Sequence, residues 1–132
     1  MTENPSHGVL VVEDDPAIRR LVMMVLQRQG YRTETAADGM EAVVKLDNSA
    51  YDVIVLDLMM PNLDGFTFLN RLAERQPDRL NSVIVTSAAS PNLIRERMNG
   101  KTFQVLPKPF DIHELVGAVR LCIASQNLPA DR

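Results

Sequence analysis

The sequence has few of the features that mark disulfide-stabilised, membrane or nucleic-acid-binding proteins. Cys122 is the single cysteine among 132 residues, so no disulfide can form within the chain. No apolar run approaches the ~18 residues that span a bilayer, and the opening residues MTENPSHG lack the basic flank and apolar stretch of a signal peptide. No cluster of lysine and arginine resembles a nucleic-acid footprint. We therefore expect a soluble, cytoplasmic protein that contacts neither a membrane nor nucleic acid directly.

The composition is that of one globular domain. The 132 residues are 45% hydrophobic and 23% charged, with a formal net charge of −3, and a chain of this length can bury a substantial core. We expect the domain over residues 8–125, a disordered lead over 1–7 and a flexible tail over 126–132. Arg71, Arg75 and Arg79 are spread among acidic residues, which predicts a solvated helix face. Cys122 falls on the apolar side of the last helical pattern, which predicts an inert core thiol.

Short β-branched runs alternate with helical patterns five times. The runs predict strands over residues 9–12, 32–36, 53–56, 83–86 and 103–106. The patterns predict helices from Pro16 to the stop at Gly30, over 40–46, over 66–74, over 92–98 and after Asp111, with a loop at 61–65. This (βα)₅ order predicts an α/β fold with one doubly wound, five-stranded parallel sheet, right-handed crossovers and helices on both faces.

Charged side chains follow three of the expected strands. Asp14 and Asp15 follow the first strand, Asp57 the third and Lys108 the fifth. The carboxyl ends of parallel strands open on one edge, so these groups should converge on one crevice. Two like charges about 5 Å apart cost roughly 3 kcal/mol at an effective dielectric of 20. A site that keeps such a cluster should hold Mg²⁺, with the three aspartates and the backbone carbonyl of Met59 as ligands.

The same residues could carry phosphoryl chemistry. An aspartate beside Mg²⁺ can attack phosphorus and form an aspartyl-phosphate, and the protein then mainly positions groups and neutralises charge. Lys108 could cover one phosphoryl oxygen, and the hydroxyl of Ser87 or Thr86 another. Prolines on both sides of Lys108 stiffen its position, and Lys108-Pro109 is a candidate cis bond. The competing interpretation is that Asp14-Asp15 only caps a helix and that Lys108 is an exposed loop residue.

At this point the sequence resembles a known family. The segments VLVVEDDPAIRRLVMMVLQRQGY, DVIVLDLMMPNLDGF, VIVTSA and VLPKPFD are similar, in order, to the motifs of response-regulator receiver domains, over roughly residues 8–125. The resemblance implies a flavodoxin-like fold with strand order 2-1-3-4-5. It also implies a two-component or phosphorelay signalling protein, phosphorylated by a phosphohistidine on a sensor histidine kinase or phosphotransfer protein.

Carried across by position, the resemblance assigns roles to the residues at the strand ends. Asp57 matches the phosphoacceptor, Asp14 and Asp15 match the acidic pair that binds Mg²⁺, and Lys108 matches the invariant lysine. Ser87 best matches the switch hydroxyl.

Two positions near the expected switch depart from the family pattern. Thr86 is the alternate hydroxyl, because the segment between Ser87 and Lys108 is one residue shorter than the resemblance leads us to expect. Three residues before the lysine, where the family often has an aromatic residue, this chain has Val105, and Phe103 stands two residues earlier. A standard aromatic switch is therefore in doubt.

The resemblance implies a switch in place of a conventional enzyme. Phosphorylation on Asp57 should alter the face around the fourth and fifth strands and the short fourth helix, which would bind a downstream partner or output domain, with dimerisation as a further possible outcome. The segment after the last helix resembles no output domain, which slightly favours a stand-alone regulator. Met59 and Ala89 flank the expected path of attacking water and orient it poorly, which predicts slow self-dephosphorylation.

Three alternatives remain. One is a degenerate receiver that serves as a phosphorylation-independent scaffold. Another is an aspartyl-phosphate phosphatase of the haloacid-dehalogenase type, which needs a second aspartate where this chain has Met59. The third is a flavodoxin-like cofactor binder, whose phosphate loop after the first strand would have to replace the acidic Glu13-Asp14-Asp15.

Overall fold

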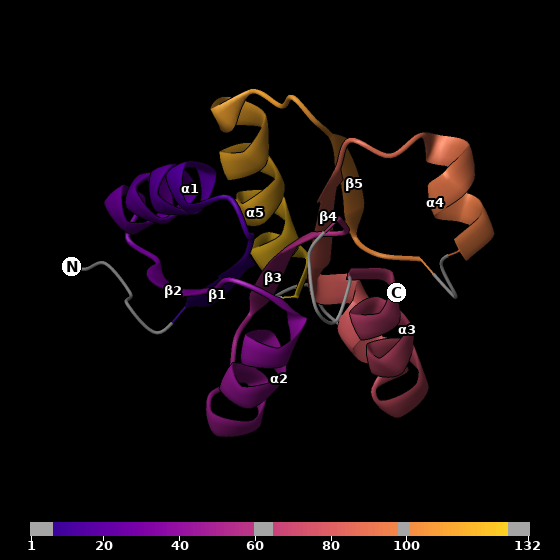
Figure 1. The fold of residues 1–132 in the computed structure, drawn as a ribbon. Helices are drawn as coiled ribbons and strands as arrows, with labels where there is room; N and C mark the ends of the chain where they lie inside the picture. The colour runs from indigo at the N-terminus through magenta and orange to yellow at the C-terminus, as the bar shows by residue number, and fades with distance from the viewer. Residues whose placement is uncertain (1–6, 60–64, 98–100, 127–132) are drawn as a thin grey trace.

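The computed structural model describes residues 7–59, 65–97 and 101–126, and they form a three-layer α/β fold around one sheet (Figure 1). The strands are β1 (Gly8–Val12), β2 (Arg32–Ala36), β3 (Val53–Asp57), β4 (Val83–Ser87) and β5 (Gln104–Pro107). All pairings are parallel, and the order is β2-β1-β3-β4-β5. The predicted doubly wound sheet and its strand order are confirmed.

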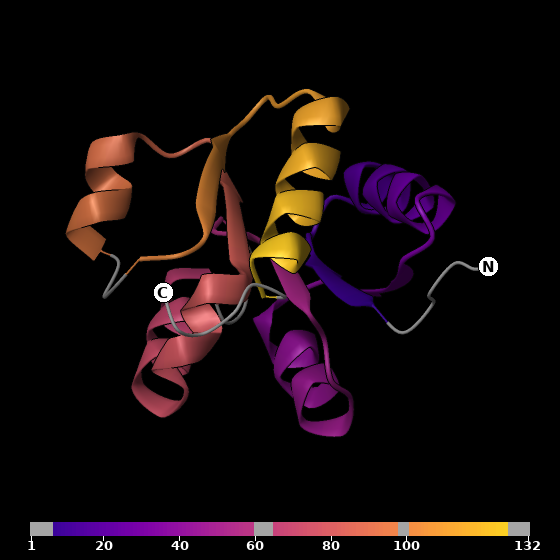
Figure 2. The same ribbon diagram turned by 180° about the vertical axis from the view of Figure 1, so that it is seen from behind.

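The helices lie on both faces of the sheet (Figures 1 and 2). They are α1 (Pro16–Arg28), α2 (Gly39–Asn48), α3 (Gly65–Arg75), α4 (Pro91–Arg97) and α5 (Ile112–Gln126), and a 3₁₀ helix, η1 (Pro77–Ser82), precedes β4. Strand residues alternate between the two faces. Val9 and Val11 pack with α1 and α5, whereas Leu10 and Val12 pack on the side of α2, α3 and α4. Covering both faces explains why β1, β3 and β4 are buried at every position.

Helix α1 begins and ends where its sequence predicts. The Asp15 carboxylate accepts hydrogen bonds from the backbone N–H groups of Ala17 and Ile18, at 2.9 and 3.2 Å, and so caps the helix. Gly30 has φ = 95°, a left-handed conformation that favours glycine, and it terminates the helical stretch. The Asp15 side chain therefore fixes the start of α1.

Several boundaries differ from the prediction by one or two residues. β3 and β4 each run one residue further, to Asp57 and Ser87, so both side chains belong to the strand ends themselves. β5 begins and ends one residue later than predicted. The 3₁₀ helix η1 was not predicted, because its segment PDRLNS has no apolar period of its own.

The ends of the described chain are joined to the sheet. The backbone carbonyl of His7 accepts a hydrogen bond from the Arg32 N–H at 2.9 Å, and Gln126, the last residue of α5, donates to the Asp52 carbonyl at 2.8 Å. The rest of the predicted lead and tail, 1–6 and 127–132, lies outside the described residues, as do Pro61 and Asp64.

The interior agrees with the prediction for the cysteine. Cys122 is buried within α5, and burial raises the pKa of its thiol to about 11, as expected for an inert thiol. Among the residues described, no helix is both long enough and apolar enough to cross a bilayer.

Candidate functional site

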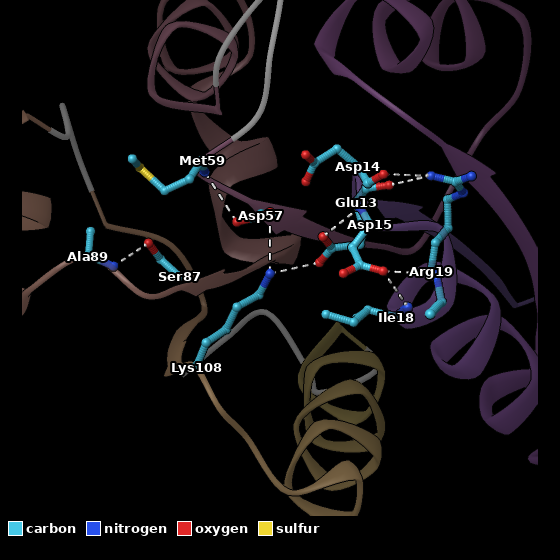
Figure 3. A network of polar contacts seen from close by, with 11 residues as sticks. Glu13, Asp14, Asp15, Ile18, Arg19, Asp57, Met59, Ser87, Ala89 and Lys108 are labelled. Atoms are coloured by element: carbon cyan, nitrogen blue, oxygen red, sulfur yellow. Dashed lines mark hydrogen bonds and ion pairs between the residues drawn. The ribbon is translucent and has the colours of Figure 1, made fainter.

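A lysine joins two buried carboxylates at the edge of the sheet where β1, β3 and β5 end (Figure 3). Lys108 Nζ lies 2.9 Å from Glu13 Oε1 and 3.3 Å from Asp57 Oδ2. The residues come from three separate parts of the chain, which only the parallel sheet brings together. Glu13 and Asp57 are 4% and 3% exposed, so these charges are held largely out of water.

A third carboxylate completes a cation-binding geometry. One oxygen from each of Glu13, Asp14 and Asp57 lies within 4.8 Å of the others. Asp14 is exposed, so the cluster opens to solvent on its side. Carboxylate oxygens are the ligands that Mg²⁺ prefers, and Mg²⁺ usually keeps several waters beside one or two carboxylates. The donor set present here therefore fits Mg²⁺.

The electrostatics show that Lys108 only partly compensates the acids. Burial raises the pKa of Glu13, opposed by its hydrogen bond from Lys108, and burial likewise raises the pKa of Asp57, opposed by the Met59 N–H and by Lys108. Burial alone would lower the pKa of Lys108, but its bond to Glu13 and the charge of Asp57 outweigh burial and raise it. With Asp14 counted, three carboxylates face one ammonium group, which leaves room for a further cation.

Arg19 holds the turn that carries the first two acids. Its Nη1 donates to the backbone carbonyls of Glu13 and Asp14, at 2.9 and 3.3 Å (Figure 3). The Glu13 N–H also donates to the Ala36 carbonyl at 3.0 Å, which continues the pairing of β1 with β2 by one residue. Sequence reasoning missed Arg19, because an arginine one turn into a helix gives no signal that it bonds backwards to the strand.

Asp57 is positioned by the chain on both sides of it. Its Oδ1 accepts a hydrogen bond from the Met59 N–H at 3.1 Å, which leaves Oδ2 to Lys108. Gly65 packs directly against this segment, and a Cβ there would lie 2.4 Å from Leu58 Cα and 2.6 Å from the Asp57 carbonyl oxygen. Any larger residue at this position would push the segment that carries the carboxylate. The Met59 carbonyl remains a predicted ligand.

Ser87 and Thr86 occupy different places at the end of β4. Thr86 pairs with Asp57, and Ser87 is one residue further along and pairs with Pro107. The Ser87 carbonyl accepts the Lys108 N–H at 2.9 Å, and its hydroxyl accepts the Ala89 N–H at 2.9 Å. Ser87 therefore lies at the rim beside Lys108, and its hydroxyl is engaged with the loop after β4.

Asp15 does not belong to the cluster that the sequence predicted for it. Its Oδ1 caps the N-terminus of α1, and Glu13 stands beside Asp14 and Asp57 in the cluster that the structure brings together. The physical reason is visible in the sequence: Asp before Pro is a favoured cap and first-turn pair. Because β1 ends at Val12, the first two residues past the strand are Glu13 and Asp14.

The β5 side of the site lacks an aromatic ring at its expected place. Val105 is 38% exposed and pairs with Val85, while Phe103 is partly buried against the core on the side of α5. Phe103 is therefore not a substitute for a ring at position 105. The peptide between Lys108 and Pro109, a candidate cis bond from the sequence, is cis.

Comparison with known proteins agrees with the fold. A family model described as the response regulator receiver domain matches residues 9–120. The transcriptional regulatory protein TrcR of Mycobacterium tuberculosis is 37% identical over 115 residues, which cover 85% of this chain but only 43% of TrcR. The chain thus spans less than half of that relative.

Solved structures give the same result. The receiver domain of the Francisella response regulator 1452 has a TM-score of 0.81 at 35% identity, with 94% of this chain and all (100%) of that one covered. The Thermotoga maritima response regulator TrrA, solved in complex with Mg²⁺ and BeF, has a TM-score of 0.73 at 29% identity, with 88% and 98% covered. Since the family model covers most of the chain, the protein belongs to the response regulator receiver domain family.

Proposed function

We propose that Asp57 accepts a phosphoryl group, with Mg²⁺ as cofactor, from a phosphohistidine on a sensor histidine kinase or phosphotransfer protein. The observation that carries the proposal is the contact of Lys108 Nζ with both Glu13 and Asp57, beside an exposed Asp14. A buried carboxylate with one lysine and an adjoining cation site is what phosphoryl transfer to aspartate requires.

The transfer follows from the placement of the side chains. A carboxylate oxygen of Asp57 forms a bond to phosphorus while the bond from phosphorus to the donor's imidazole nitrogen breaks, and the imidazole keeps the electron pair. Lys108 stays anchored to Glu13 at 2.9 Å and can transfer its weaker 3.3 Å contact from Asp57 to a phosphoryl oxygen.

A cation would be held by residues already in place. Asp14 and Asp57 would bind Mg²⁺ directly, Glu13 would bind it directly or through water, and the Met59 carbonyl would add a backbone ligand. Bound there, Mg²⁺ would neutralise charge on the transferring phosphoryl oxygens.

The switch would act through the end of β4. A phosphoryl group on Asp57 carries about −1.5 to −2 charge and three acceptor oxygens. The Ser87 hydroxyl, which accepts the Ala89 N–H, would turn its own O–H toward one of them, and the loop leading to α4 would rearrange with it. Leu93 on α4 and Val105 on β5, 36% and 38% exposed, belong to the surface that would change its affinity for a partner.

Two further parts of the proposal are the downstream partner and the hydrolysis that removes the phosphoryl group. We infer a downstream protein or output domain as the recipient of the signal, and the relative TrcR, a transcriptional regulatory protein, is more than twice the length matched here. The chain would not be a conventional enzyme, since its own carboxylate is modified and hydrolysis resets it. Met59 and Ala89 offer no side chain that orients water, so we expect slow self-dephosphorylation.

The test is phosphorylation with acetyl phosphate and Mg²⁺, read by intact mass. We expect the wild-type chain to gain one phosphoryl group and Asp57→Asn to gain none. Asp47→Asn, at an exposed position on α2, serves as the matched control and should behave as the wild type. If the wild type gained nothing, or Asp57→Asn gained as much, the proposal would be wrong. A phosphoryl lifetime of seconds would contradict only the expected slow self-dephosphorylation, and not the phosphorylation of Asp57.

A further inference from the structure

A cavity of about 380 Å³ lies between α2 and α3, two helices that run side by side on one face of the sheet (Figures 1 and 2). It is lined by residues of α2 from Val43 to Asp47, by residues of α3 from Phe68 to Arg75, and by Gln76 and Arg79 at the start of the following segment. None of the residues of the acidic cluster lines it. The cavity is therefore a separate feature, at the lower end of the size range of ligand pockets, about 300–1,000 Å³.

The cavity has an apolar floor. Phe68 of α3 is buried, and Val43, Leu46 and Leu72 are partly buried side chains that pack against the same core. Together they line the space between the helices. A floor of this kind binds aliphatic or aromatic carbon, because contact removes apolar surface of both partners from water.

Three arginines form the charged part of the lining. Arg71 and Arg75 are one helical turn apart on α3 and thus share a face, and Arg79 joins them from η1. In the described part of the chain, none of the three guanidinium groups has an ion-pair or hydrogen-bond partner. Arg71 and Arg75 are exposed, in agreement with the predicted solvated face, and Arg79 is partly buried; all three line the same cavity.

Two acids moderate this charge without cancelling it. Asp47 and Glu74 also line the cavity, and both are exposed. Three guanidinium groups against two carboxylates leave an excess of one positive charge. Arginine offers several N–H donors in a planar fork that matches a carboxylate or phosphate.

We propose that the groove between α2 and α3 binds a small organic anion, a carboxylate or phosphate carried on an apolar body of about eight carbons. The carbon chain would lie on Phe68, Val43 and Leu72, and the anionic group would meet the arginines at the rim. The proposal does not depend on phosphorylation of Asp57, since the two sites share no residue.

The test uses four probes of matched size or charge, followed by NMR on the labelled full chain. Octanoate combines both features of the ligand, octanol keeps only the apolar chain, octylammonium reverses the charge, and acetate keeps only the anion. We expect saturable shifts at the methyl groups of Val43, Leu46 and Leu72 with octanoate, with a Kd of about 1 mM. Octanol should bind more weakly than octanoate, by a factor of about five or more. Acetate and octylammonium should show no saturation.

Two double variants separate the arginines from general charge. Arg71→Gln with Arg75→Gln should weaken octanoate binding about fivefold or more. Arg20→Gln with Arg28→Gln, on exposed positions of α1, makes the same change in net charge and should leave the affinity unchanged. Equal binding of octanol and octanoate, equal affinities in the two double variants, or saturable shifts only outside the groove would each overturn the proposal. Phosphorylation of Asp57 measured on the same samples reports on the other site separately.

Discussion

Two ionic clusters in this domain use the same kinds of charge to opposite effect. The first, at the carboxyl ends of the strands, joins Lys108 to Glu13 and Asp57. Both carboxylates are buried, and burial raises the pKa of each. The lysine contacts both acids, yet their ionised forms remain less favourable than in water.

The second cluster lies on the edge strand β2. Glu34 accepts a hydrogen bond from the Tyr51 hydroxyl at 2.6 Å and pairs with Arg32 at 3.1 Å. The bond from Tyr51 is the chief cause of the lowered pKa of Glu34, and the Arg32 guanidinium, 5.4 Å from the centre of the Tyr51 ring, adds to it. This cluster is about one-third exposed, and its carboxylate is more favourable than in water.

The difference shows what a functional acid requires. At the edge strand, the Glu34 carboxylate already has Tyr51 and Arg32 as partners, and no further cation is needed to stabilise it. At the strand ends it keeps two carboxylates desolvated and a third nearby, so any arriving cation meets unsatisfied charge.

The largest effect is expected for Lys108→Met. In metal-free buffer at pH 8 this change leaves Glu13 and Asp57 ionised without their shared partner, and we expect a loss of about 2 kcal/mol in the free energy of unfolding. The value is set below the 3–5 kcal/mol for a fully buried broken pair, because the lysine is partly exposed. Urea titration measures it.

The control for this variant is Arg32→Met in the exposed cluster. Breaking that surface pair should change the free energy of unfolding by about 0.5 kcal/mol or less. Similar losses in the two variants would mean that burial does not distinguish the clusters, and the comparison would fail.

The second prediction separates the two neighbouring aspartates by Mg²⁺. At a concentration ten times Kd, Mg²⁺ should raise the free energy of unfolding by about 1.4 kcal/mol through binding linkage. Asp14→Asn should lose this gain and should be more stable than the wild type without metal, because a repelling charge is gone. Asp15→Asn should keep the gain, since asparagine also caps a helix. If Asp15→Asn lost the stabilisation by Mg²⁺ and Asp14→Asn kept it, Asp15 would be a Mg²⁺ ligand, as the sequence predicted.

The third prediction concerns Asp15 as a cap. Asp15→Ala removes the acceptor for the N–H groups of Ala17 and Ile18 and should cost about 1 kcal/mol in unfolding free energy. The cost should be the same with and without Mg²⁺, which urea titration in both buffers can measure. A cost seen only with Mg²⁺ would show that this carboxylate acts on the metal.

Much of the fold could be predicted from local patterns, because β1, β3 and β4 are buried on both faces and are therefore largely apolar. β3 and β4 were located to within one residue for this reason. The 3₁₀ helix η1 could not be located in this way, because its residues show no apolar periodicity and its turns depend on contacts with the chain around it.

The site was predictable in outline but not in its detailed contacts. Asp57, Asp14 and Lys108 follow strands, and strand ends of a parallel sheet meet at one edge. β1 ends at Val12, as predicted, so the exchange of Asp15 for Glu13 came from the cap: Asp15 accepts hydrogen bonds from the start of α1, a role that the sequence offered only as the competing interpretation. The contact of Lys108 with Glu13 spans 95 positions, and no local pattern reports on it.

The smallest effect, and the most specific, is a difference in the sign of pH dependence. The pKa of Asp57 is raised above 3.8 in the folded chain, so its contribution to stability is present below that pH and is lost as pH rises through the folded pKa. The pKa of Glu34 is lowered below 4.5, so its contribution is present above that pH and is lost as pH falls. Between pH 3.5 and 6, set by these two ordinary values, the stability of Asp57→Asn relative to wild type should therefore rise with pH. That of Glu34→Gln should fall over the lower part of the same range. Urea titrations of the three proteins at several pH values measure both slopes, and slopes of the same sign would show that the two clusters treat their carboxylates alike.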